Sequence, residues 1–149
     1  SRPDPRGRAS LEYNRHMNVL AHDVDLVDVS RIEHMISEHG DRFLDRVFTE
    51  QERSYADDGG ARRAERYAAR FACKEAVFKV LGTGWGQGVG WSEVSVHRDA
   101  NGCPSLEVTG VVRDKAASLG ITSWFVSISH TDGQAMASVI ATGGAGSDR

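Results

Sequence analysis

The chain has 149 residues, enough to form one hydrophobic core without disulfide or metal staples. Its formal net charge is −3, so no global positive field favours nucleic acid, and only a local basic patch could bind one. No segment reaches the roughly 18 apolar residues of a membrane-spanning helix, and the arginine-bearing start lacks the apolar centre of a signal peptide. We therefore expect a cytoplasmic protein with no membrane or nucleic-acid partner.

Residues 1–16 contain four arginines and show no hydrophobic periodicity, whereas apolar alternation begins just after Met17. We interpret 1–16 as an extension or an expression remnant, 17–141 as the folded domain and 142–149 as a flexible tail. Cys73 and Cys103 match no Cys-x-x-Cys or metal-binding spacing, so both are expected to be reduced and structural.

Alternation predicts a strand up to about residue 29 that places Asp25 on the same face as Val27. A helix should follow at Ser30, which has capping-box spacing to Glu33, and should end at Gly40. Thr49 starts a second, shorter helix with the same capping signal. A long helix is then expected over about 61–81.

The long helix is informative because Glu75 and Lys79 stand one turn apart among alanines and phenylalanines. Together with Asp25, Glu75 makes two misplaced acids in one small domain, which favours a site for a hard metal ion. Four basic residues also recur every four positions: Arg62, Arg66, Arg70 and Lys74. Like charges in this arrangement repel, so they form either a solvated flank or an anion-binding face on which a phosphate relieves the repulsion.

The second half of the chain is predicted to form strands around one helix. Strands are expected at 93–99, 106–108, 124–130 and 135–141, with a helix at 111–119. The glycine-rich loop 82–90 follows a helix instead of preceding one, which excludes a Walker or dinucleotide-binding fingerprint. We predict an α+β fold, a single domain in which a small antiparallel sheet is packed by the long helix.

Five blocks occur in an order and at separations that resemble holo-acyl-carrier-protein synthase, the small type of phosphopantetheinyl transferase. They are DLVDVSRIE (25–33), RFLDRVFT (42–49), RFACKEA (70–76), GTG (82–84) and VSISH (126–130). Each block is short, but five in order make the resemblance specific. It extends over about 17–141, nearly the whole predicted domain.

The resemblance implies transfer of the 4′-phosphopantetheine arm of coenzyme A to a serine of an apo acyl carrier protein, with release of adenosine 3′,5′-bisphosphate. Asp25 and Glu75 match the family's two Mg²⁺ ligands, and carboxylate oxygens suit a hard cation that bridges a diphosphate. Mn²⁺ is not distinguished from Mg²⁺. Lys79 matches a lysine that neutralises phosphate charge, although an i,i+4 ion pair with Glu75 is the alternative. The general base is left open between Glu75, Asp25 and a metal-bound water.

The resemblance also implies binding residues. Coenzyme A would contact Arg70, Lys79, Gly82, Gly84, His130 and Thr131, and the acidic helix of the carrier would contact Arg31, Arg42 and Arg46. Without the resemblance, His130 would be interpreted as a core histidine and the arginines as solvated side chains. Family members of this size form trimers with active sites between subunits, so Asp25 and Glu75 would act with a neighbour's groups.

Two other functions are considered: a non-catalytic coenzyme A or nucleotide-binding module, and a metal-dependent pyrophosphate hydrolase. The joint presence of Asp25, Glu75, Lys79 and His130 favours the transferase. The chain departs from the family at Asp23, where relatives usually have glycine, so an extra carboxylate is expected near the metal or the local backbone differs. Whether the carrier serves fatty-acid or polyketide synthesis is left open.

Overall fold

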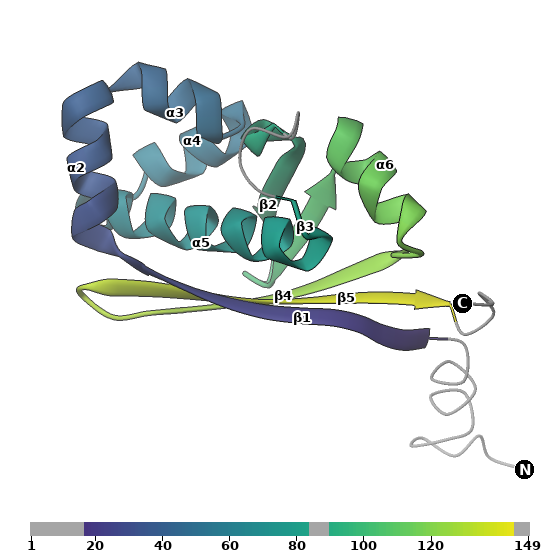
Figure 1. Ribbon diagram of the computed structural model, residues 1–149. Coiled ribbons are helices and arrows are strands. Elements are labelled where there is room, and N and C mark those ends of the chain that lie inside the picture. Colours follow the sequence, from purple (N-terminus) through teal and green to yellow (C-terminus); the bar gives the residue numbers. More distant parts are fainter. Residues whose placement is uncertain (1–16, 84–89, 145–149) are drawn as a thin grey trace, which may run out of the picture.

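The computed structural model describes residues 17–83 and 90–144 (Figure 1). The elements in these residues are β1 (Met17–Asp28), α2 (Val29–His39), α3 (Asp41–Val47), α4 (Glu50–Asp57), η1 (Gly60–Arg62), α5 (Arg63–Leu81), η2 (Trp91–Glu93), β2 (Val94–Arg98), β3 (Pro104–Val108), α6 (Gly110–Ser118), β4 (Ser123–His130) and β5 (Gln134–Gly144). The predicted α+β class is confirmed. None of the described helices is long and apolar enough to cross a lipid bilayer.

The main sheet has three antiparallel strands in the order β1-β5-β4, so the last strand of the chain lies in its centre. Strands β2 and β3 form a separate hairpin. The helices lie on one face of the main sheet, and no described element covers the other face (Figure 1). This arrangement confirms the predicted antiparallel sheet packed by one long helix, α5.

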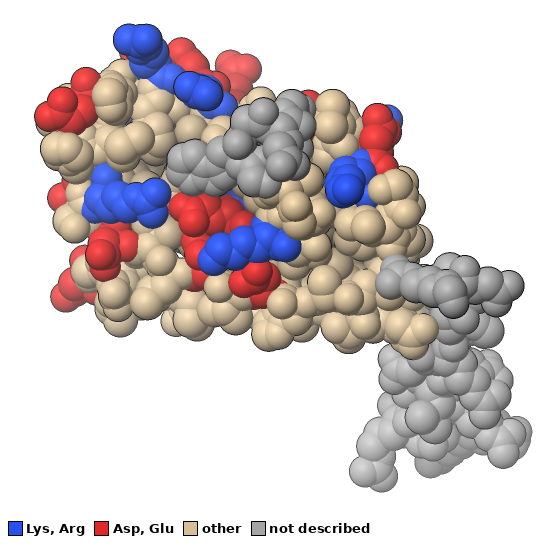
Figure 2. Space-filling view, in the orientation of Figure 1, with Lys and Arg blue, Asp and Glu red and all other residues tan. Residues whose placement is uncertain are grey.

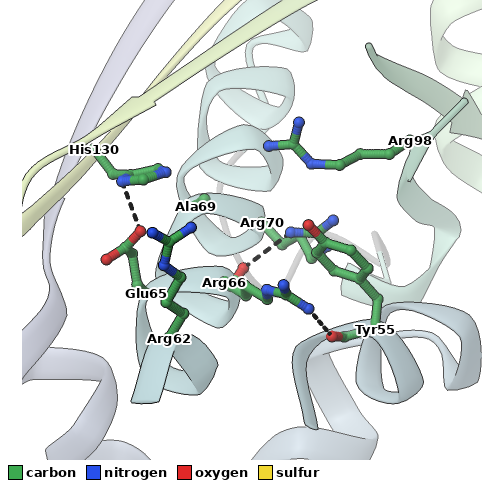
Figure 3. A pocket seen from close by; sticks show the side chains of 8 residues that line it. All are labelled: Tyr55, Arg62, Glu65, Arg66, Ala69, Arg70, Arg98 and His130. Atoms are coloured by element: carbon green, nitrogen blue, oxygen red, sulfur yellow. Dashed lines mark hydrogen bonds and ion pairs between the residues drawn. The ribbon is translucent and has the colours of Figure 1, made fainter. Parts of the chain in front are cut away.

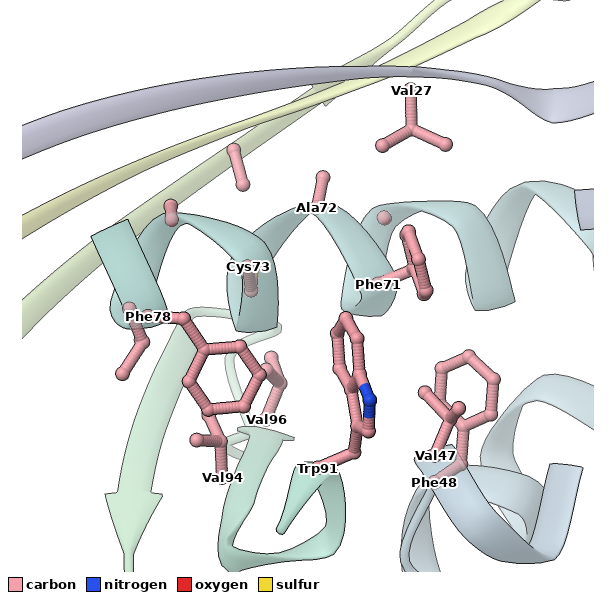
Figure 4. Packing of buried hydrophobic residues seen from close by; sticks show 14 of the residues in the cluster. Val27, Val47, Phe48, Phe71, Ala72, Cys73, Phe78, Trp91, Val94 and Val96 are labelled. Carbon is pink, nitrogen blue, oxygen red and sulfur yellow. The ribbon is translucent and has the colours of Figure 1, made fainter. Parts of the chain in front are cut away.

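Small side chains bring α5 close to the sheet. Alanines are fully buried on both sides of this contact, at positions 72 and 76 of α5 and at 135, 137 and 141 of β5. Val27 of β1 points toward α5, and Ala72 points from α5 toward the sheet (Figure 4). Because an alanine leaves the two backbones free to approach, acidic residues on β1 and α5 can face one another.

The opposite side of α5 packs on aromatic residues. Phe71 stacks on Trp91 with ring centroids 5.0 Å apart, and Phe78 meets the same indole edge-on at 4.9 Å (Figure 4). These contacts anchor α5 to the segment that enters β2. Helix α5 is therefore buried on most of its circumference, and its exposed positions are few.

Lys74 forms a buried ion pair instead of belonging to a solvated flank. Its ammonium lies 2.7 Å from Oε1 of Glu52, and both side chains are completely buried. The ammonium also donates to the carbonyls of Trp91 and Val94, while Glu52 accepts from the backbone N–H of Val96 at 3.0 Å. Burial lowers the pKa of Lys74, and the Glu52 carboxylate opposes that shift. The pair joins α4, α5 and β2.

We expect Lys74→Met to lower the free energy of unfolding by about 3–5 kcal/mol, because it leaves Glu52 buried without its counter-charge. Adding Glu52→Gln to this variant should recover part of the loss, since a neutral amide is cheaper to bury. Urea unfolding measures both effects. The control is Lys115→Met on the exposed side of α6, where we expect a change within about 0.5 kcal/mol. Equal losses in the single and double variants would contradict this account.

Two of the predicted capping features differ in outcome. The capping box of Thr49 and Glu52 is confirmed, with both reciprocal hydrogen bonds present at 2.9 and 3.2 Å. The predicted box of Ser30 and Glu33 is wrong, because α2 already begins at Val29 and no side chain caps it. Strand β1 passes directly into α2, so the position of Ser30 is set by strand pairing and not by its hydroxyl.

The long helix α5 ends at Gly82, as predicted, and this glycine adopts the left-handed conformation with φ of 70°. The predicted tail begins too early, however. Strand β5 continues to Gly144, which pairs with Met17, and Thr142 is buried. Its carbonyl accepts a hydrogen bond from the N–H of Thr122 at 2.8 Å. Residues 142–144 therefore belong to the sheet.

Candidate active site

The three predicted catalytic residues lie together between β1 and α5. Asp25 extends from the inner face of β1 and is 8 % exposed, and the side chain of Glu75 on α5 is 15 % exposed. Lys79 donates to Oδ1 of Asp25 at 2.7 Å. Acidic and basic side chains gather on this face of the molecule (Figure 2). Lys79 is thus paired with Asp25, and not with Glu75 as the local helical spacing allowed.

Crowding of the two acids alters their protonation. Burial raises the pKa of Glu75 to about 7, and the charge of Asp25 and a hydrogen bond with it act in the same direction. Arg31 and Lys79 oppose this shift. The pKa of Lys79 is raised, chiefly by its hydrogen bond to Asp25. Near neutral pH, replacing the Glu75 proton with a bound cation therefore requires little free energy.

The carboxylates fit a hard metal ion. Oδ2 of Asp25 and Oε1 of Glu75 are buried and have no hydrogen-bond partner, so each has a lone pair free for a ligand. Within 17–83 and 90–144, no group of three or more His, Cys, Asp or Glu side chains could hold a metal by itself. Mg²⁺ commonly takes one or two carboxylates and completes its shell with phosphate oxygens and water. Two acids therefore suffice if the substrate supplies phosphate.

The raised pKa predicts a pH-dependent stability for the metal-free protein. The folded state holds the Glu75 proton more tightly than the unfolded state, so stability falls as pH rises from about 4.5 to about 7. Glu75→Gln keeps the site neutral and should stabilise the protein at pH 8 by about 1–3 kcal/mol, with little difference at pH 5. Urea unfolding in chelator, beside the exposed control Glu38→Gln, tests this. A Glu75→Gln effect of equal size at both pH values would contradict it.

A second ionic cluster surrounds a cavity of about 230 Å³ beside the first half of α5 (Figure 3). The lining residues are Tyr55, Arg62, Glu65, Arg66, Ala69, Arg70, Arg98 and His130. We call this cavity the arginine pocket. Arg62 comes from η1, Arg66 and Arg70 from α5, and Arg98 from β2. His130 comes from the end of β4.

Arg70 is the most constrained cation of the arginine pocket. It is 2 % exposed, its Nε has no hydrogen-bond partner, and burial lowers its pKa. The guanidiniums of Arg66 and Arg70 both lie 4.2 Å from the ring centroid of Tyr55. Such stacking holds the planar groups in place while their N–H donors stay available. The arrangement fits a phosphate, as the predicted anion-binding face requires.

His130 is not a core histidine. Its side chain is 42 % exposed, and Nδ1 lies 2.6 Å from Oε1 of Glu65 (Figure 3). Thr131 follows it at the exposed end of the β4–β5 hairpin. The two predicted phosphate contacts, Arg70 and His130, therefore line the same pocket.

The structure does not bring the two clusters together within one chain. Arg70 and Glu75 are five residues apart on α5, which places them roughly 140° apart around the helix. Glu65 and Glu75 are separated by ten residues, or about 15 Å along the axis. The acidic cluster and the arginine pocket are thus two separate clusters of the same chain.

Sequence reasoning missed three polar residues of the arginine pocket: Tyr55, Glu65 and Arg98. Arg62 and Arg66 had a signal in their four-residue spacing. Arg98 also donates to the carbonyl of Gly102 at 2.6 Å, which ties it to the turn between β2 and β3. Arg98 joins the cluster only because β2 packs beside α5. No local sequence pattern predicts that contact.

The predicted carrier-binding arginines lie near the acidic cluster to different degrees. Arg31 is in the first turn of α2, and its guanidinium turns toward the site, 3.6 Å from Glu75 and 5.2 Å from the ring centroid of Phe71. Arg42 and Arg46 are exposed on α3. Arg31 therefore links the surface of α2 to the acidic site.

The remaining predicted residues are placed as follows. Asp23 lies two positions before Asp25 on the same strand face, is half-buried, and its charge contributes to the raised pKa of Lys79. Gly82 ends α5 just beyond Lys79. Gly84 lies outside the described residues. Asp23 thus adds negative charge beside the two predicted metal ligands.

An acidic cluster that can take a cation and a basic pocket that can take an anion suit an enzyme that acts on phosphate groups. The sequence model of the 4′-phosphopantetheinyl transferase superfamily matches residues 24–138. The chain therefore belongs to this family, which confirms the resemblance predicted from the five blocks.

Individual relatives agree. The chain is 46 % identical over 133 residues to a holo-[acyl-carrier-protein] synthase of Desulforudis audaxviator, covering 88 % of this chain and 98 % of the relative. The crystal structure of the Neisseria meningitidis holo-[acyl-carrier-protein] synthase matches with a TM-score of 0.75 at 27 % identity, covering 83 % and 98 % of the two chains. A Bacillus anthracis holo-(acyl-carrier-protein) synthase in complex with CoA (3′,5′-ADP) matches with a TM-score of 0.68 at 32 % identity, covering 84 % and 97 %.

Proposed function

We propose that this protein is a holo-[acyl-carrier-protein] synthase that transfers the 4′-phosphopantetheine arm of coenzyme A to a serine of an apo acyl carrier protein, releasing adenosine 3′,5′-bisphosphate. The observation that carries the proposal is the pair of unpartnered carboxylate oxygens of Asp25 and Glu75 beside Lys79, in a chain of this family. Lys79 and Arg31 pair with these carboxylates, and the two oxygens that accept no hydrogen bond can still take a further ligand.

Asp25 and Glu75 would hold Mg²⁺, or Mn²⁺ in its place, and the bound cation would neutralise charge on the diphosphate of coenzyme A. Lys79 is half exposed and keeps its positive charge beside Asp25, so its ammonium can reach a phosphate oxygen that gains charge as the bond breaks. Glu75, Asp25 or a metal-bound water would accept the proton of the serine hydroxyl.

The arginine pocket would bind the remaining phosphate of coenzyme A. Arg70 offers an unpartnered buried N–H, and His130 and Arg62 line the same cavity. A dianionic phosphate placed there would relieve the repulsion among the arginines. Gly82, Gly84 and Thr131 stay assigned to the nucleotide by the family resemblance alone.

We further propose a homotrimer with active sites between subunits. The acidic cluster and the arginine pocket lie on different sides of α5, roughly 140° apart around its axis. The arginine pocket of a neighbouring subunit would therefore have to complete each acidic cluster. The uncovered face of the sheet supports association, because four of its apolar side chains are 39–56 % exposed: Val24, Leu26, Phe125 and Met136. Apolar side chains gathered on one face are typical of a protein interface.

The acidic helix of the carrier would dock along α2 and α3. Arg31, Arg42 and Arg46 give this edge three exposed arginines, and charge of this kind steers association. Cys73 and Cys103 are both free, which fits the reducing cytoplasm as the place of action.

Incubation with coenzyme A, Mg²⁺ and candidate apo carriers from fatty-acid and polyketide synthesis tests the function. We expect a carrier mass increase equal to one phosphopantetheine group and release of bisphosphate only when carrier is present. Bisphosphate released with and without carrier would instead identify a pyrophosphate hydrolase. Binding of coenzyme A without any product would identify a non-catalytic module.

A further inference from the structure

Among the residues that the structure describes, Glu65 is the one acidic residue that lines the arginine pocket. It lies in the first turn of α5, between Arg62 and Arg66, and its side chain is 17 % exposed. Within the described parts of the chain, its recorded ion pair is with His130. It therefore reaches across from α5 to the end of β4 and connects two elements of the same pocket.

A carboxylate in an anion-binding pocket opposes the ligand. At a few ångströms, like charges near a protein surface repel by about 1–4 kcal/mol, so Glu65 reduces the affinity of the pocket for phosphate unless it contributes something else. Its contact with His130 provides that contribution. The 2.6 Å separation of Oε1 from Nδ1 requires a proton on Nδ1, since two lone pairs would repel at this distance.

Fixing one ring nitrogen determines the role of the other. With Nδ1 held by Glu65, the imidazole is orientated about its two side-chain torsions and Nε2 is directed away from the carboxylate. His130 needs such a restraint because it is the last residue of β4 and its side chain is 42 % exposed. A free imidazole at a strand end would sample several rotamers and lose entropy on binding a ligand.

We propose that Glu65 is a positioning residue that holds Nδ1 of His130 so that Nε2 is presented to a phosphate group in the arginine pocket. This inference rests on the proposed function, because it takes coenzyme A as the source of that phosphate. Glu65 acts through His130 and does not touch the ligand. Its effect on binding should therefore change sign when His130 is removed.

A double-mutant cycle on coenzyme A affinity tests the sign. In the wild-type background, Glu65→Ala should weaken binding about tenfold, because a charge-assisted restraint on His130 is lost. In the His130→Ala background, the same substitution should tighten binding roughly threefold, because only the unfavourable charge is removed. Isothermal titration calorimetry measures all four proteins. Glu65→Gln, whose amide oxygen can still accept from Nδ1–H, should keep most of the wild-type affinity.

Two controls separate positioning from general charge effects. Glu50→Ala removes an exposed acid from the first turn of α4, outside the pocket, and should leave coenzyme A affinity unchanged in both backgrounds. Long-range ¹H–¹⁵N spectra of the histidine rings should show Nδ1 of His130 protonated in the wild type and in Glu65→Gln, and a mixture of tautomers in Glu65→Ala.

Each result supports or overturns the inference. Weakening of the same size in both backgrounds, or a wild-type tautomer retained in Glu65→Ala, would overturn it. A wild-type protein that bound no coenzyme A would overturn the proposed function instead. The same cycle with inorganic phosphate as the probe would then decide the positioning role on its own.

Discussion

Replacing Asp25 or Glu75 with alanine should reduce phosphopantetheine transfer on the order of 10³-fold or more, because each change removes one of the two carboxylates that would hold the cation. The fold should persist. Glu75→Ala removes an acid whose Oε1 accepts no hydrogen bond and whose ion-pair partner, Arg31, is exposed to water. Asp25→Ala leaves Lys79 half exposed, where water can solvate its ammonium. The measurements are carrier mass shift at saturating Mg²⁺, circular dichroism and urea unfolding.

The matched control is Glu38→Ala, which removes an exposed acid from α2. It should retain wild-type turnover. Near-normal turnover in either Asp25→Ala or Glu75→Ala would show that the acidic cluster is not the metal site. Loss of circular dichroism signal would show instead that these carboxylates are needed for folding.

Mixing two inactive variants should restore activity if the acidic cluster of one subunit meets the arginine pocket of another. In a cyclic trimer, a chain with Asp25→Ala still offers its arginine pocket, and a chain with Arg70→Ala still offers its acidic cluster. In an equal mixture, about one interface in four would pair an intact cluster with an intact pocket, so activity near one quarter of wild type is expected. Co-expression followed by a transfer assay measures it.

A second mixture distinguishes sites between subunits from sites within one chain by the fraction of activity that remains. Wild type mixed equally with the double variant Asp25→Ala/Arg70→Ala should give about one quarter of full activity if sites lie between chains, but about one half if each chain holds a whole site. Because Arg70 is buried, the mixture is repeated with His130→Ala, whose exposed position tolerates substitution. No recovery in the first mixture, with one half in the second, would place the whole site in one chain.

Local determinants made several parts of the molecule predictable. Period-two alternation placed Asp25 on the buried face of β1 with Val27, and the structure agrees. The capping box of Thr49 and Glu52 and the end of the long helix at Gly82 were predicted because each depends on residues within one turn. The family was predictable for a related reason, since its blocks are short contiguous segments.

Pairing between distant residues was not predictable in the same way. Lys74 looked like one of four stacked surface cations, yet it is buried against Glu52, which lies 22 positions earlier. Lys79 could have paired with Glu75 one turn away, but it is bound to Asp25 on another element. In both cases the spacing along the helix allowed a different environment from the one observed. Spacing alone does not determine which side of α5 packs against β1 and which against α4 and β2.

The sequence by itself therefore predicted most of the elements, the family and the two acids proposed as metal ligands, because each is encoded in residues close together along the chain. The tertiary structure alone decided that 142–144 complete the sheet, that Glu65 meets His130, and that the acidic cluster and the arginine pocket lie on different sides of α5. The physical reason is that burial and charge pairing depend on distances through space, which are set only when α5 packs between the sheet and β2.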